Sequence, residues 1–187
     1  MRTSATTDAA GATTGSAGTK RSRLPRGSGV SAERFRRTLG AHAAGVVVVT
    51  ADTAEGPVGM TATSFAGASL DPPLVSFFVD AGSNTWPGIR DSRAFAVNIL
   101  GEDQQEVATR FATRGVDRFA APTQWHRGPE GLPLLGGAAA HVLCLHHDLF
   151  AVGDHWLVVG RVAAAESAAD GGRPLLYHRG RYGSFAA

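Results

Sequence analysis

Short runs of apolar, often β-branched residues recur along most of the chain, and turn-forming residues bound each run. Val46 to Thr50 is one such run, and a polar turn over residues 51–56 follows it. Runs of this length and composition are typical of β-strands, because branched side chains pack well on a pleated surface. The strands that this pattern predicts span residues 46–50, 57–63, 74–79, 94–100, 138–152, 155–166, 174–177 and 181–185.

Helical spacing of apolar residues is confined to shorter segments. Phe35 and Leu39 follow Ser31 at the spacing of one helical face, and serine is a favoured N-cap, which predicts a helix over residues 31–43. Two further helices are predicted over residues 84–91 and 103–113. A long irregular loop is predicted over residues 114–137.

This succession of elements predicts a mainly β protein. The chain has 187 residues, which suits one domain with a sizeable core. Mostly antiparallel strands with a few helices at the rim favour a closed or nearly closed barrel, because closure removes exposed sheet edges.

The first 29 residues differ from the rest in composition. They are rich in Ala, Thr, Ser and Gly and contain little that a core could bury, so we expect a disordered tail over 1–29 and a domain over 30–187. The tail holds five basic residues and one acidic residue, out of totals of 18 and 16. The domain is therefore mildly acidic, and the basic pI gives no support to a nucleic-acid partner.

Cysteine content and hydropathy bear on the compartment. Cys144 is the only cysteine, which excludes an internal disulfide and a Cys-x-x-Cys pair and suits a reducing cytoplasm. The sequence contains no apolar stretch long enough to span a membrane and no apolar core of a secretory signal. We expect a cytoplasmic protein without a membrane partner.

Several catalytic motifs are missing, and the histidines do not form a metal motif. There is no G-x-S-x-G elbow, P-loop or G-x-G-x-x-G after a strand. Strand alternation separates His141 and His147 from His146 and Cys144, so no metal site is expected. A metal-dependent hydrolase using the histidines is kept as a minor alternative.

Two hydroxyl clusters are more informative. Thr61, Thr63 and Ser64 lie at the end of a predicted strand beside glycine, where a flat ligand can approach the backbone. The segment 83–85 (Ser-Asn-Thr) precedes a predicted helix, and helix starts bind phosphate readily. The simpler alternatives are hydroxyls that satisfy local backbone groups and an ordinary N-cap.

An acid and an imidazole stand at the bend between the two longest predicted strands. Gly153 and Asp154 are usual hairpin-turn residues, which leaves a plain polar turn as one interpretation. That interpretation does not explain His155, because other polar residues suit the position equally well.

The order of several short segments resembles the flavin reductase family with the FMN-binding split-barrel fold, whose members are reductase partners of two-component flavin monooxygenases. The similarity covers about residues 32–185. The matching stretches are FRRTLGAHAAGVVVVTA, GMTATSFAGASLDPPLVSF, SNTWPGIRDSRAFAVNIL, QQEVATRFA, DRF, GLPLLGGAAAHVLC, GDHWLVVGRV and PLLYHRGRYG.

The resemblance implies an antiparallel split β-barrel of Greek-key type and roles for particular residues. The segment Thr61, Ala62, Thr63 and Ser64 would bind the edge of the flavin ring, largely through backbone groups. The flavin phosphate would be bound by Ser83, Asn84 and Thr85. The other side of the ring would be lined by Asn98 and Ile99.

The resemblance also implies a reaction. His155, supported by Asp154, would hold NADH while a hydride passes to FAD or FMN, and reduced flavin would reach a separate monooxygenase of secondary metabolism or aromatic hydroxylation. Such proteins are typically homodimers. The alternative within the same fold is a flavin- or haem-binding carrier or sensor without catalysis.

Overall fold

A computed structural model describes residues 29–168 and 172–185. The predicted disordered tail over 1–29 lies outside these residues except for Gly29. The helices are α1 (Ala32–Leu39), α2 (Trp86–Asp91), α3 (Gln105–Ala112) and the 3-10 turn η1 (Pro129–Gly131). The strands are β1 (Ala44–Gly45), β2 (Val47–Thr53), β3 (Gly56–Ala62), β4 (Ala66–Leu70), β5 (Pro73–Asp80), β6 (Ala94–Ile99), β7 (Trp125–Arg127), β8 (Pro133–Leu135), β9 (Ala140–Val152), β10 (His155–Ser167), β11 (Leu175–His178) and β12 (Arg181–Ser184).

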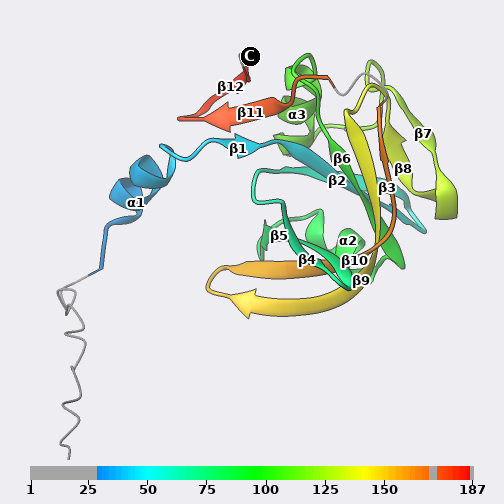
Figure 1. Ribbon diagram of the computed structural model, residues 1–187, viewed down its shortest axis with the longest axis horizontal. Coiled ribbons are helices and arrows are strands. Elements are labelled where there is room, and N and C mark those ends of the chain that lie inside the picture. Colours follow the sequence, from blue (N-terminus) through cyan, green and yellow to red (C-terminus); the bar gives the residue numbers. More distant parts are fainter. Residues whose placement is uncertain (1–28, 169–171, 186–187) are drawn as a thin grey trace, which may run out of the picture.

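The predicted class is confirmed: the protein is mainly β, and its strands pair antiparallel. Seven strands form one sheet in the order β3-β2-β6-β9-β10-β5-β4, which curves around the core in Figure 1. A three-stranded sheet (β1-β11-β12) and a two-stranded sheet (β7-β8) flank it. Strands β3 and β4 are the two edges of the main sheet, so closure of a barrel by backbone pairing is not seen.

Some predicted boundaries were wrong. The first helix ends at Leu39 rather than near residue 43, with Gly40 as its C-cap. Ser31 does cap it, because its hydroxyl accepts from the Arg34 N–H. The segment predicted as an irregular loop contains the β7–β8 hairpin, and β4 was not predicted. Within the described ranges, no helix is long and apolar enough to cross a membrane.

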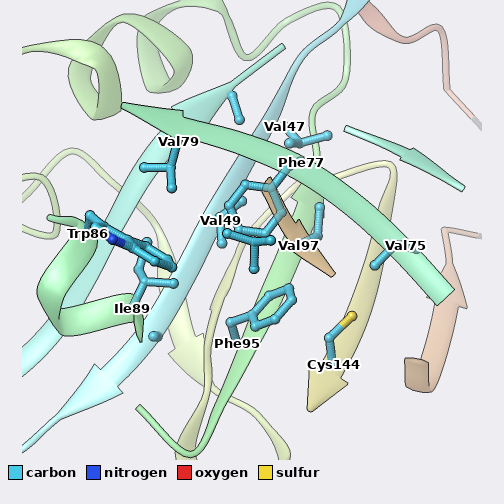
Figure 2. Close-up of a cluster of buried hydrophobic side chains, with 13 residues drawn as sticks. Val47, Val49, Val75, Phe77, Val79, Trp86, Ile89, Phe95, Val97 and Cys144 are labelled. Atoms are coloured by element: carbon cyan, nitrogen blue, oxygen red, sulfur yellow. The ribbon is translucent and has the colours of Figure 1, made fainter. Parts of the chain in front are cut away.

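The main core lies on the concave side of the seven-stranded sheet. Alternate residues of its strands point inward, among them Val49, Phe77 and Phe95, which are fully buried. Figure 2 shows Trp86 and Ile89 of α2 packed against one side of this cluster. The helix therefore holds the segment 83–85 in a fixed place beside the sheet.

Phe95 explains a glycine in β10 and the environment of the only cysteine. The Phe95 ring meets Phe77 edge to face at 5.6 Å and covers Gly160, where an added Cβ would stand 2.4 Å from the ring. Cys144 lies in the same layer and is 1% exposed (Figure 2). Burial raises the pKa of the Cys144 thiol to about 12, so the thiol stays protonated and unreactive.

Candidate active site

A cavity of about 480 Å³ opens at one edge of the main sheet. Its walls come from β3, from the segment 83–85 between β5 and α2, and from the C-terminal end of α3 with the loop after it. Thr61, Ser83, Asn84 and Thr85 all line it. One residue of the first hydroxyl cluster and all three of the second thus face one space, whereas Thr63 and Ser64 are not among the residues that line it.

Arg118 is one of four charged residues that line this cavity, together with Arg114, Asp80 and Asp117. Its Nη1 donates to the hydroxyl of Thr85 and to the carbonyl of Gly59, both at 2.7 Å. Its Nε and Nη2 donate to the carbonyl of Thr113 at 3.2 and 2.8 Å. Burial lowers the pKa of Arg118, but a guanidinium stays charged at neutral pH. In the part of the chain that the structure describes, no carboxylate lies within salt-bridge distance of Arg118, and four of its five N–H groups donate to the partners just named.

The segment 83–85 is held by its own hydrogen bonds and by α2. The Thr85 N–H donates to the Ser83 hydroxyl at 3.3 Å, and Thr85 itself is the N-cap of α2. The N-cap alternative for the segment 83–85 thus applies to Thr85, although its side chain makes no capping hydrogen bond, and Ser83 lies two residues before the cap position. Asn84 is exposed to solvent at the mouth of the cavity. Hydroxyl and amide groups beside a guanidinium form a set of donors that suits a phosphate.

The hydroxyls of the segment 61–64 are used within the protein. Thr61 donates to the carbonyl of Ala108 at 2.7 Å, and the Ser64 hydroxyl bonds the backbone N–H and C=O of Phe78. Both hydroxyls thus satisfy backbone groups, but those of residues 47 and 14 positions away rather than the local groups of the simpler alternative. However, β3 is an edge strand, so part of its backbone has no partner strand and can bond a ligand that approaches from that side.

His155 and Asp154 lie at the rim of the same region. Gly153 takes φ 62° in the turn, and His155 begins β10 opposite Val152 on one side and Asp80 on the other. Asp80 lines the cavity, and the Ala81 N–H donates to the Asp154 carbonyl at 3.0 Å. The pairing register of β5 and β10 thus places the turn between β9 and β10, with Asp154 and His155, at the edge of the cavity.

The imidazole of His155 is oriented by the adjacent Asp154. His155 Nδ1 is 2.7 Å from the Asp154 carboxylate, and the His155 side chain is 43% exposed. This hydrogen bond is the main reason why the pKa of Asp154 lies below its ordinary value. Because a carboxylate only accepts, Nδ1 carries the proton of this hydrogen bond.

Asn98, which the resemblance assigns to the flavin ring, lies in the interior and is not among the residues that line the cavity. Its side chain is fully buried, with Nδ2 donating to the Val48 carbonyl and the Thr50 hydroxyl, and Oδ1 accepting from the Leu135 N–H. All of its polar atoms are engaged in linking β2, β6 and β8. Ile99 packs against the main core and is absent from the cavity lining.

The remaining histidines of the C-terminal third have separate surroundings. His141 contacts the carbonyl of Leu135, His147 contacts Asp148, and His146 packs on Phe95. Among the described residues, no three side chains of the metal-binding types gather around one point.

Sequence reasoning missed Arg118 as a site residue. The segment DRF contributes only to the resemblance to the flavin reductase family. No neighbouring residue in the sequence distinguishes Arg118 from the other arginines. Its position depends on the carbonyls of Gly59 and Thr113, which the fold brings together from β3 and the end of α3.

Comparison with known proteins supplies a match over most of the chain. The model of the "Flavin reductase like domain" matches residues 39–186. An NADH:FMN oxidoreductase of Rhodococcus erythropolis is 42% identical over 158 residues, covering 83% of this chain and 82% of the relative. The reductase subunit HsaB of a flavin-dependent monooxygenase of Rhodococcus jostii is 40% identical, covering 82% and 77%. The solved NADH:FAD oxidoreductase SgcE6 of Streptomyces globisporus, in complex with NAD and FAD fragments, superposes with a TM-score of 0.78 at 37% identity, covering 82% and 92%.

Proposed function

The chain belongs to the flavin reductase like domain family, and from this premise we propose that it transfers a hydride from NADH to FMN or FAD. Reduced flavin then passes to a separate flavin-dependent monooxygenase, which suits secondary metabolism or aromatic hydroxylation. Relatives named as NADH:FMN oxidoreductase and as a monooxygenase reductase subunit support this function. The observation that carries it is one cavity with a guanidinium and hydroxyls on one wall and a pinned imidazole at its rim.

The fold that goes with this function is a split barrel over residues 30–187. The hydrogen bonds of Ser64 to Phe78 support it, because they extend the β4–β5 pairing by two residues and so hold the segment that follows β3 against β5.

The donor set of the cavity fits a flavin nucleotide. The guanidinium of Arg118 and the hydroxyls of Ser83 and Thr85 would hold the phosphate, with Asn84 at the mouth. The backbone of the segment Thr61, Ala62, Thr63 and Ser64 would bond the polar edge of the ring. Bound flavin supplies an acceptor for the hydride. The chain's own part is to fix the two reactants at contact distance, which needs little acid or base chemistry.

We assign His155 to the nicotinamide side. Asp154 keeps Nδ1 protonated, so Nε2 is the atom that meets the nicotinamide amide or shares a proton with the reduced product. Half of the imidazole surface is open to a ligand while its orientation is fixed by one hydrogen bond. NADH is the preferred donor, in keeping with the relatives' names.

A homodimer in the cytoplasm completes the proposal. Apolar side chains on the outer face of the β9–β10 hairpin and of β5 are unusually exposed, with Phe150 at 51%, Val152 at 47% and Phe78 at 40%. Exposed apolar patches of this kind mark protein interfaces, and a second copy would cover this one beside the cavity. A single, buried cysteine suits a reducing compartment.

One assay tests the reaction, and one pair of variants tests the phosphate site. NADH absorbance should fall only when FMN or FAD is added; a tightly bound coloured ligand without NADH oxidation would indicate a carrier instead. The double variant Ser83→Ala with Thr85→Ala should weaken flavin binding about tenfold, because two hydrogen bonds to a charged group are lost. Thr38→Ala, which removes a hydroxyl from α1 outside the cavity, is the control.

A further inference from the structure

The helix α1 buries none of its side chains within its own chain. All of its residues are exposed, with Phe35 and Leu39 each at 55%, and Figure 1 shows the helix standing apart from the sheets. In the described ranges, the hydrogen bond that ties the end of this helix to a sheet runs from the Arg179 N–H to the Gly40 carbonyl. Isolated helices of eight residues are marginal in water, so α1 needs a surface on which to pack.

The side chains of α1 make it both amphipathic and basic. Phe35 and Leu39 lie one turn apart on the same face of the helix. The charged side chains of the helix are Glu33, Arg34, Arg36 and Arg37. Among the described residues, none of the three arginines has a carboxylate within 4 Å, whereas four arginines elsewhere do. Such a helix fits an apolar strip that acids border.

An apolar strip crosses the outer face of the main sheet. Phe150, Leu157 and Phe78 are direct partners across β9, β10 and β5, so their side chains form one row on the same face. Val152 lies one row further along β9, opposite His155. Three of the four apolar side chains are the unusually exposed ones of the sheet described above. The strip therefore needs a cover, and the candidate histidine stands at its border.

Acids border this strip on both sides. Asp80 lies in the row of His155, and Asp148 lies in the row on the opposite side of the strip. Asp154 adds a third carboxylate at the turn, and two of the three acids bond an adjacent histidine at 2.7 Å. The first arginine along β10 is Arg161, one row beyond Asp148. The charge around the strip is thus opposite to that of α1.

We propose that α1 of one copy packs on the outer face of β5, β10 and β9 of a second copy, with Phe35 and Leu39 on the apolar strip. The proposal rests on the homodimer of the proposed function and names the segments that build it. Each copy offers one helix and one face, so two identical contacts close a two-fold dimer. Because His155 borders the strip, the helix of the second copy forms one wall of the nicotinamide side.

A cross-link tests the contact directly. Leu39→Cys combined with Phe150→Cys, treated with a short bis-maleimide, should give a covalent dimer on a denaturing gel, because the native Cys144 is buried and unreactive. Leu39→Cys combined with Leu70→Cys is the matched control, because Leu70 is 97% exposed at the end of β4, outside the strip. The control pair and each single variant should stay monomeric on the gel.

Each other result of the cross-linking overturns the proposal. A monomer with an internal cross-link, identified by mass spectrometry, would show that α1 packs on the hairpin of its own chain. A covalent dimer of Leu39→Cys alone would show that two helices meet each other. The absence of a cross-link, or equal yields from the Phe150 and Leu70 pairs, would show that α1 does not lie on the strip.

Phe35→Ser combined with Leu39→Ser provides a second test that leaves the core untouched. It should weaken the dimer about tenfold in sedimentation and raise KM for NADH about fivefold, with the dissociation constant of the flavin unchanged. Leu70→Ser, the control, should match the wild type in all three. An unchanged dimer, an unchanged KM or an equal loss of flavin affinity overturns the proposal. A wild type that cross-links as expected but does not oxidise NADH with added flavin would instead refute the proposed function.

Discussion

His146 and His155 stand nine positions apart on the two strands of one hairpin, and their surroundings differ sharply. His146 is half-buried on the ring of Phe95, with Nε2 3.4 Å from the Ser92 hydroxyl, and burial lowers its pKa. His155 is exposed at the rim of the cavity, with one nitrogen held by Asp154. One ring is used for packing, and the other is kept rigid yet accessible, as contact with a ligand requires.

The largest expected effect is on turnover. His155→Ala should lower kcat/KM for NADH about 100-fold, an order of magnitude typical of losing a group that positions or polarises a reactant. The flavin dissociation constant and the thermal midpoint should stay close to those of the wild type. Unchanged NADH oxidation by His155→Ala would show that His155, like His146, has no role in the reaction.

The matching change at the other histidine should act on stability. His146→Ala opens space beside Phe95 and should lower the free energy of unfolding by about 1–2 kcal/mol, as for partly buried rings. Denaturant unfolding measures this. Turnover per folded molecule should be retained; a loss as large as that of His155→Ala would show that His146 also serves the reaction.

Asp154 should show a smaller, graded effect if it orients the imidazole. Asp154→Ala should reduce kcat/KM for NADH about fivefold and Asp154→Asn about twofold, because an amide oxygen still accepts from Nδ1. Steady-state kinetics of both variants is the measurement. Equal losses in the two variants would argue against orientation through this hydrogen bond.

The smallest effect is a pH dependence of stability. Because the folded protein holds His146 at a lowered pKa, the unfolded chain binds this proton more readily, so the free energy of unfolding should fall as pH drops below about 6.5. His146→Phe keeps an aromatic ring against Phe95 and should flatten this part of the curve. Denaturant midpoints at pH 7.5 and 5.5 test it, and an unchanged difference between the two pH values would contradict it.

The sequence predicted the elements whose patterns are local. The run from Val46 and the long pair around residue 153 were confirmed as β2, β9 and β10. Ala66–Leu70 was missed because small residues with a glycine have low strand propensity, and backbone pairing with β5 decides their conformation. The β7–β8 hairpin was missed because its strands are short and Pro133 begins one of them.

The residues of the candidate site also divide into those that a local sequence pattern predicts and those that depend on long-range contacts. The hydroxyls of the segment 83–85 were found because they cluster in sequence. The side of the sheet on which the Asn98 side chain lies could not be predicted. Residues 94–98 are buried on both faces of the sheet, so no alternation of polar and apolar residues marks the face toward the core. Arg118 depends on two carbonyls from distant segments, and only the folded chain brings them together.

The seclusion of Cys144 has a practical consequence for studying this protein. With its one native thiol closed off and protonated, a cysteine introduced on the surface would be the single site open to maleimide dyes. Paired labels on the hairpin tip and on α3 would then report, by energy transfer, whether these walls approach each other when nucleotides bind.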